Sequence, residues 1–225
     1  PHVSDFFSFS GIDVELDLRL VFRPELFETL YIPSPAASRE FSIHPYRLHE
    51  MARVVERLRQ RRPSFTPPSR VYFSRQGLPV STRYILNEDD VVKVHESFGF
   101  TAVKPHALDM AEEMLFCSNM DVVSCLHCSA INNAMFSSNV TTGIILYDDY
   151  VNYRDPVMMH IVSPIIKNVY ALKDVVKPAY DFNANFFWYT TACEIDIDVL
   201  RTQASFLLKE KPSRLHSVAF LCDDT

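Results

Sequence analysis

The fold is decided by residues 69–136, SRVYFSRQGLPVSTRYILNEDDVVKVHESFGFTAVKPHALDMAEEMLFCSNMDVVSCLHCSAINNAMF. Within this stretch, short runs rich in β-branched and aromatic residues alternate with longer runs whose apolar residues recur at helical spacing. The short runs predict strands and the longer runs predict helices. Strands that alternate with helices of this length indicate βαβ units. We therefore expect an α/β fold: a Rossmann-like, mostly parallel sheet with flanking helices.

Local signals place the elements of this stretch. Strands and helices are predicted in alternation at Arg70–Ser74, residues 87–98, Phe100–Val103, Asp109–Asn119, Asp121–Ser124 and Ser129–Phe136. Asn87 can cap the first helix, whose acidic first turn suits the positive end of the helix dipole. Gly99 is placed to end that helix. We expect a polar loop between the first strand and Leu86.

Upstream of the stretch, residues 26–33 alternate like a strand, and residues 45–61 carry apolar side chains on one helical face. The two prolines at 67 and 68 are the best candidate boundary in the chain. We expect a partial N-terminal lobe or linking region over residues 1–66 and a Rossmann-like domain over residues 67–225.

Downstream, two further strands are predicted at Thr142–Tyr147 and Asn168–Leu172. A closing helix is predicted over Asp196–Lys209, with Asp196 as its cap. These elements extend the same pattern of alternating strands and helices.

Composition excludes several classes of protein. Apolar residues make up 48% of the 225 residues, which is enough for a sizeable core. The formal net charge of −6 argues against a nucleic-acid partner, because phosphate backbones need a basic surface. Only 4 glycines are present, and they form neither a dinucleotide-binding G-x-G-x-x-G motif nor a Walker A motif. Charges break the apolar runs, so no membrane span is expected and membrane association is not indicated.

The 5 cysteines are an odd number, and free thiols in a reducing cytoplasm are their simplest interpretation. The sequon at residues 139–141 keeps the lumen of the endoplasmic reticulum or Golgi open as an alternative. The chain starts at Pro1 without a signal-peptide pattern, which suggests a processed chain or a fragment.

Two loops carry unusual chemistry for the carboxyl ends of parallel strands, where α/β folds bind ligands. The first carries Ser74-Arg75 and then Arg83, and the second carries LHCSAINN at residues 126–133. Arginine forks together with a helix N-terminus can hold a diphosphate without glycines. His127 can bond a phosphate or a sugar hydroxyl. Solvated loop arginines and a buried structural histidine are the alternative that these residues leave open.

Five blocks, taken in order and spacing, resemble glycosyltransferase family 61, of the capsular polysaccharide biosynthesis type. They are RVYFSR, RYILNE-x-D, GF-x-x-V-x-P, L-x-x-A-E-E and DVVSCLHCSAINNAMF. That family typically shows S-R, R-x-[IL]-x-N-E, G-F, an A-E-Q-like helix and H-G-A-x-x-x-N-x-x-F. The resemblance extends over about the middle third of the chain.

The resemblance implies an inverting, metal-independent GT-B-type transferase that uses no cofactor. Its partners would be a nucleoside-diphosphate sugar as donor and a glycan or glycoconjugate as acceptor. A GT-B enzyme has two Rossmann-like lobes, and the matched blocks belong to the second, donor-binding lobe. Residues 1–66 are too short for a complete first lobe, so we expect an incomplete or reduced N-terminal part.

Matched residue by residue, the resemblance implies that Arg75 and Arg83 face the nucleotide diphosphate. Asn87 and Glu88 would cap and position the helix behind them. His127 would lie at the diphosphate turn, and it is the one candidate within the chain for the general base.

The remaining substrate-binding candidates are Glu113, Ser129 and Asn133, of which Asn133 falls on the last asparagine of the H-G-A block. The chain departs from the family at Cys128, where a glycine is usual, and at Glu113, where a glutamine is usual. A cysteine can obstruct the close approach of backbone to phosphate, and an acid can repel it. These departures leave open a catalytically inactive homologue that acts as a binding or scaffold module.

Three other patterns have weaker interpretations. A zinc site at Cys125 and Cys128 would need a second ligand pair, which the sequence does not offer. Asp148-Asp149 ends a strand and could contact a donor sugar or ribose. The arginines of residues 53–62 form a solvated helix face or a contact for an anionic acceptor or membrane.

A hydrolase or phosphatase would need a nucleophile elbow or a Cys-x5-Arg loop, and neither occurs.

Overall fold

The computed structural model describes residues 45–78, 84–146, 165–172, 174–178, 192–209 and 218–221. The strand predicted at residues 26–33 lies outside these residues, as do Arg83 and the Asp148-Asp149 pair.

The core of the fold is a six-stranded sheet in which every neighbouring pair of strands is parallel. Its order is β3-β1-β4-β5-β6-β9. The strands are β1 (Arg70–Phe73), β3 (Thr101–Val103), β4 (Val122–Leu126), β5 (Thr142–Leu146), β6 (Asn168–Leu172) and β9 (Val218–Leu221). The predicted α/β class and the predicted mostly parallel sheet are confirmed. The last strand, β9, was not predicted.

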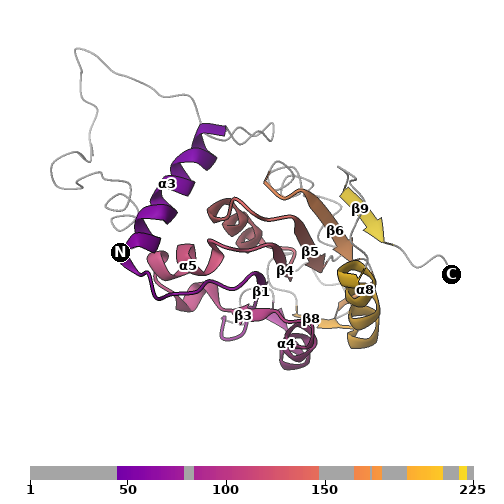
Figure 1. Cartoon of the computed structure of the whole chain (residues 1–225). Coiled ribbons are helices and arrows are strands. Elements are labelled where there is room, and N and C mark those ends of the chain that lie inside the picture. Colours follow the sequence, from indigo (N-terminus) through magenta and orange to yellow (C-terminus); the bar gives the residue numbers. More distant parts are fainter. Residues whose placement is uncertain are drawn as a thin grey trace, which may run out of the picture.

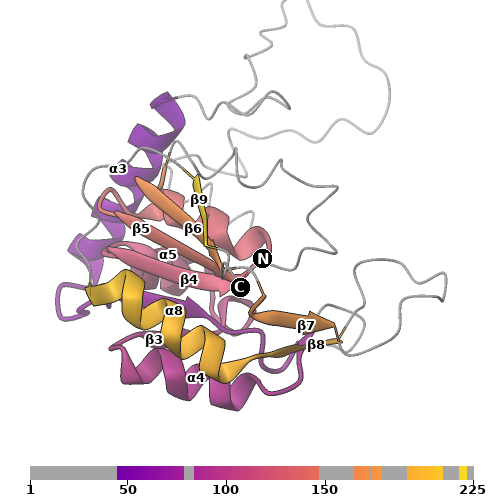
Figure 2. The same ribbon diagram turned by 90° about the vertical axis from the view of Figure 1, so that its right-hand side faces the viewer.

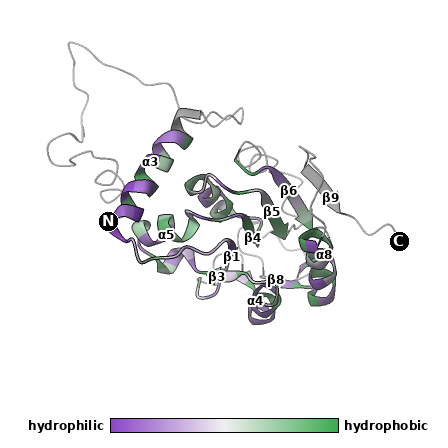
Figure 3. Ribbon diagram, in the orientation of Figure 1, coloured by the Kyte–Doolittle hydropathy of each residue, from purple (hydrophilic) through white to green (hydrophobic). Residues whose placement is uncertain are grey.

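The central strands are apolar on both faces because helices cover both sides of the sheet. All five residues of β4 are buried, and so are all five of β5. Parallel sheets bury both faces, so their strands contain continuous apolar runs without alternation. Figure 3 shows this as the darkest green of the ribbon in the middle of the sheet. This burial fixes β4, and therefore the loop that follows it, in the centre of the molecule.

Helices form one layer on each face of the sheet (Figures 1 and 2). One layer contains α4 (Glu88–Ser97) and α8 (Ile197–Lys209). The other contains α3 (Pro45–Arg61), α5 (Met110–Cys117) and the 3-10 helix η2 (Ser129–Phe136). Each layer has its own apolar core against the sheet. Among the helices of the described residues, none has the length and apolarity to cross a bilayer.

Helix α3 has the bounds that its periodicity predicts. Its apolar face packs on α5 and is buried at Met51, Val54, Val55 and Leu58. Arg59 adds a polar tie, because its guanidinium donates to the backbone oxygen of Ser118 at 2.6 Å. The helix upstream of the two prolines therefore shares a core with the parallel sheet's own helices.

A second, smaller sheet has the order β2-β8-β7, formed by β2 (Tyr84–Ile85), β8 (Ala192–Ile195) and β7 (Val176–Pro178). The prediction of a polar loop up to Leu86 is therefore wrong for residues 84 and 85, which form β2. Strand β2 pairs in parallel with β8, and its partner lies more than 100 residues further along the chain. A local pattern of two residues cannot reveal such a pairing.

The predicted helix ends at Asp109, Asp196 and Gly99 are confirmed. Asp109 forms a capping box with Glu112 at the start of α5. Asp196 accepts from the amides of the first turn of α8. Gly99 follows α4 with a φ of 79°, a left-handed conformation that glycine adopts at little cost.

We predict that Gly99→Ala lowers the free energy of unfolding by about 1 kcal/mol. The loss is conformational, because among the described residues no atom lies within 4 Å of a Cβ at this position. Urea unfolding measures it, and Gly99→Asn is the matched control, because asparagine tolerates the left-handed region better than alanine. Equal stability of Gly99→Ala and the native chain would contradict this explanation.

Candidate functional site

The switch point of the strand order lies between β1 and β4, and the region at the carboxyl ends of these two strands is called the crevice below. From β1 the chain crosses to β3 on one side, and it then returns to β4 on the other side of β1. The connections that leave β1 and β4 therefore diverge, and in parallel sheets the crevice at this point is where ligands bind. Phe73 lies opposite Cys125, so the chain leaves the two strands close together. The two loops that the sequence singles out thus flank one crevice.

Glu88, the first residue of α4, fixes the loop after β1. Its carboxylate is buried, with 5% of the residue exposed. Oxygen Oε1 accepts hydrogen bonds from the Tyr72 hydroxyl at 3.2 Å, the Ser74 hydroxyl at 2.9 Å and the backbone amide of Arg75. The resemblance implied that Glu88 positions the helix, whereas these contacts show that it also holds the Ser74-Arg75 segment against that helix.

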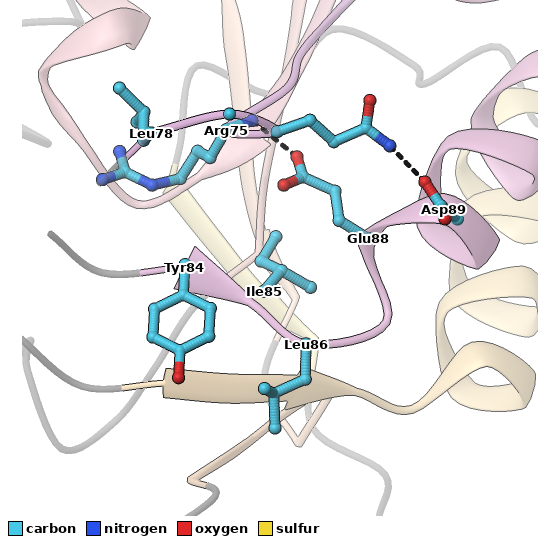
Figure 4. A pocket seen from close by; sticks show the side chains of 9 residues that line it. Arg75, Leu78, Tyr84, Ile85, Leu86, Glu88 and Asp89 are labelled. Atoms are coloured by element: carbon cyan, nitrogen blue, oxygen red, sulfur yellow. Dashed lines mark hydrogen bonds between the residues drawn. The ribbon is translucent and has the colours of Figure 1, made fainter. Parts of the chain in front are cut away.

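The Ser74-Arg75 segment forms one side of a pocket, and β2 forms the other. In Figure 4, Arg75 and Leu78 lie on one side, Tyr84 and Leu86 lie on the other, and Glu88 lies between them. The pocket encloses about 220 Å³ within the described residues. That is less than the 300 to 1,000 Å³ or so of sites that hold a whole drug-sized molecule. The described walls therefore enclose less space than such a ligand fills, and Arg83 belongs to the neighbouring residues that are not described.

On the β4 side, His127 continues the ladder to β5, because its amide donates to the carbonyl of Leu146 at 3.1 Å. His127 is only 2% exposed. Cys128 is also buried, and its backbone is extended at φ −160° and ψ 170°. Any residue adopts that conformation, so a glycine is not required there. Ser129 is exposed and begins η2 beside the crevice.

Glu113 and Asn133 pair with each other. The Asn133 amide nitrogen donates to Glu113 Oε1 at 2.6 Å, and this bond ties α5 to η2. The carboxylate that departs from the family pattern therefore has a structural use in the wall behind the β4 loop. Burial raises the pKa of the nearby Cys117 thiol well above its usual value, and the charge of Glu113 raises it further. The hydrogen bond between these two predicted substrate-binding residues therefore holds η2 against α5.

The expected side-chain cap by Asn87 is wrong, although Asn87 does occupy the N-cap position of α4. Its amide nitrogen donates to the carbonyl of Ile195 at 2.7 Å, and its side-chain oxygen accepts from the Ile195 amide at 2.9 Å. Because a side-chain amide carries a donor and an acceptor, it can extend a ladder as a peptide group does. Asn87 thus fastens β8, and with it the β2 wall of the pocket, to the start of α4.

A buried pair of rings supports the crevice from behind. His95 stacks on Tyr72, with ring centroids 4.1 Å apart at an angle of 19°. Its Nδ1 lies 2.8 Å from the carbonyl of Val91, and its Nε2 lies 2.8 Å from the Ser124 hydroxyl. Nδ1 must donate to a carbonyl, so in the neutral imidazole Nε2 accepts from Ser124. The stack joins β1, α4 and β4, the three elements that form the crevice.

Burial shifts both rings away from their charged forms. It lowers the pKa of His95 to about 4, against the weaker opposing effect of the Val91 carbonyl. Burial, followed by the charge of Glu88, raises the pKa of Tyr72 well above its usual value. Tyr72 therefore stays a hydrogen-bond donor to Glu88. Sequence reasoning missed Tyr72 and Ser124, because a serine or tyrosine inside an apolar strand gives no signal of its partner.

The cysteines of the C-x-x-C pattern are both buried. Cys125 lies in the apolar core between the sheet and η2. Within the part of the chain that the structure describes, no three His, Cys, Asp or Glu side chains are grouped as metal ligands would be.

Comparison with known proteins identifies a family that the chain matches. The family model described as Glycosyltransferase 61 matches residues 17–145, which is more than half of the chain. The matched range contains the loop after β1, the loop after β4 and the pocket between β2 and the Ser74-Arg75 segment. No curated protein matches the chain.

We predict that the stability of the chain falls as the pH drops from about 6.5 towards 4. His95 has a folded pKa of about 4 against an ordinary value of 6.5, so in this window the unfolded chain binds the extra proton. Between pH 7 and pH 5 the loss from this one group is about 2 kcal/mol. Urea unfolding at the two pH values measures it.

Variants with a single histidine replaced isolate the contribution of His95. In His95→Gln the difference between pH 7 and pH 5 shrinks by about 2 kcal/mol. In His106→Gln, which removes an exposed histidine, the difference is the same as in the native chain. Equal pH dependence of all three proteins would show that His95 is protonated equally in the folded and unfolded states.

Proposed function

The chain belongs to glycosyltransferase family 61, and on that premise we propose that it forms the nucleotide-sugar-binding lobe of a sugar-transferring enzyme. The donor is a nucleoside-diphosphate sugar, and the acceptor is a glycan or glycoconjugate. Transfer proceeds with inversion at the anomeric carbon and without a metal ion. The observation that carries this proposal is that β1 and β4 are paired, so that two of the family's sequence blocks leave the sheet at neighbouring strand ends.

Two groups at this crevice suit the diphosphate of the donor. Arg75 brings a cation, and the hydrogen bond from its amide to Glu88 holds its backbone in place. The first turn of η2 brings backbone amides and the exposed hydroxyl of Ser129. Arginine and helix N-termini are general binders of phosphate groups. Arg83 is a further candidate on the strength of its sequence block alone.

The reaction we propose is a single displacement. A base takes the proton of the acceptor hydroxyl, the oxygen attacks the anomeric carbon, and the bond to the diphosphate breaks on the opposite face. Negative charge grows on the leaving phosphate, and the Arg75 cation and the backbone amides of η2 stabilise it. His127 is 2% exposed, so we assign it to ordering the loop at the diphosphate. The base then comes from the acceptor side of the crevice.

The two departures from the family pattern do not favour loss of function. Cys128 has a backbone conformation that needs no glycine, and the carboxylate of Glu113 accepts a hydrogen bond from Asn133. The backbone at Cys128 is therefore unstrained, and Glu113 has a partner within the protein. An inactive homologue remains one outcome of the experiment below.

We predict that a uridine or guanosine diphosphate stabilises the chain in a thermal-shift screen. In Arg75→Ala the affinity for that nucleotide falls about 10- to 100-fold, as expected for the loss of a charged hydrogen bond. Isothermal calorimetry measures the affinities. The matched control is Arg53→Ala, which removes an exposed arginine that pairs with Glu50 on α3 and leaves the affinity unchanged.

Two results would count against the proposal. One is the absence of binding by any of UDP, GDP and their sugar conjugates, which would favour the scaffold module. The other is equal affinity of Arg75→Ala and the native chain, which would place the diphosphate elsewhere.

A further inference from the structure

The two oxygens of the Glu88 carboxylate have different surroundings. Oε1 accepts three hydrogen bonds, from Tyr72, Ser74 and Arg75. Among the described residues, no group donates a hydrogen bond to Oε2. Figure 4 shows one oxygen bonded to the Arg75 amide and the other turned into the space between Arg75 and β2. The second oxygen therefore belongs to the wall of the pocket.

An acceptor that faces a pocket can take a hydrogen bond from a bound ligand. Glu88 as a residue is only 5% exposed, and it meets the outside at the pocket that it lines. An ionised carboxylate only accepts, so its partner must carry an O–H or N–H group. A phosphate group carries none when ionised, and its charge is repelled. The ligand atom at Oε2 is therefore part of a neutral hydroxyl or amide.

The rest of the pocket indicates which part of the ligand this is. Arg75 supplies a cation on one side. The opposite side is made by Tyr84, Ile85 and Leu86, of which Leu86 is exposed. The Tyr84 ring and the exposed Leu86 side chain are groups that can pack on the flat face of a nucleobase. A nucleoside diphosphate has its ribose, with two neighbouring hydroxyls, between the base and the phosphates.

We propose that Glu88 Oε2 accepts a hydrogen bond from the ribose hydroxyls of the donor nucleotide, with the diphosphate at Arg75 and the base against β2. This inference rests on the proposed function and adds the residue that recognises the nucleoside. One oxygen of Glu88 shapes the protein while the other binds the ligand. The three internal hydrogen bonds hold the carboxylate in one orientation, so little side-chain entropy is lost when the nucleotide binds.

Glu88→Gln is the sharpest test because it changes one oxygen and keeps the shape. The glutamine oxygen can accept from Tyr72, Ser74 and the Arg75 amide, and its NH₂ group then replaces Oε2. The sign of the effect is decisive. Removing a negative charge near a diphosphate would by itself strengthen binding, whereas losing the acceptor for the ribose weakens it. We expect UDP to bind about 10-fold more weakly to this variant in calorimetry.

Deoxynucleotides identify the ligand atom. In the native chain, we expect 2′-deoxy-UDP or 3′-deoxy-UDP to bind about 10-fold more weakly than UDP. In Glu88→Gln the two deoxy analogues and UDP bind equally, because the acceptor that distinguishes them is gone. The same series with GDP and its deoxy analogues applies if the screen selects guanosine. UDP, GDP and their deoxy analogues carry no donor sugar. A difference in affinity between a nucleotide and its deoxy analogue therefore reports on the ribose alone.

Asp89→Asn is the matched control. Asp89 is exposed, lines the same pocket and accepts from the Gln76 side chain, and asparagine keeps an oxygen for that bond. The variant removes one negative charge beside the site, and it should retain the full preference for UDP over the deoxy analogues. Tyr72→Phe is a second control, which removes one donor to Oε1, lowers stability and keeps that preference.

The outcomes separate this inference from its premise. Equal binding of UDP and both deoxy analogues to the native chain would overturn the role of Glu88, even if Glu88→Gln does not fold. So would unchanged or tighter binding of UDP by a folded Glu88→Gln variant. If the native chain binds no nucleoside diphosphate at all, the proposed function itself fails.

Discussion

Three hydrogen-bond donors converge on one carboxylate oxygen, Oε1 of Glu88, and the geometry of the crevice depends on that convergence. Two of the donors belong to the segment that leaves β1, and the third is the buried Tyr72 hydroxyl within the strand. A buried carboxylate is costly unless its bonds are made. The start of α4 is therefore held to the end of β1. The backbone of Arg75 is held in place where the chain leaves the strand. Without this contact, the pocket between Arg75 and β2 would have no back wall.

The contacts around Glu88 extend its effect through the molecule. Behind it, Tyr72 stacks on His95, which bonds to Ser124 in β4 and so couples the two strands that flank the crevice. Beside it, Asn87 fastens β8 to α4 and thereby supports the β2 side of the pocket. Consecutive residues of one helix start thus fix both sides of the site. The position of the Ser74-Arg75 segment is therefore determined by the Glu88 carboxylate, and the neutral side chains of Tyr72, His95 and Asn87 support the elements around it.

The sequence alone predicts the parts of this structure that local chemistry controls. The parallel sheet, the bounds of α3, the caps at Asp109 and Asp196 and the helix end at Gly99 each follow from a few adjacent residues. The two loops leave neighbouring strand ends, and their role as a binding site stays a prediction. Pairings over a long chain distance were missed, among them β2 with β8 and Asn87 with Ile195. Those contacts depend on how distant strands are placed, which no local pattern contains.

A crystal structure of the chain with bound UDP, or with GDP if that nucleotide binds better, tests the central claim most directly. The account predicts the diphosphate between the carboxyl ends of β1 and β4, in contact with Arg75 and the first turn of η2. It also predicts the ribose at Oε2 of Glu88. A nucleotide bound at the opposite edge of the sheet, or on the outer face of α3, would contradict it.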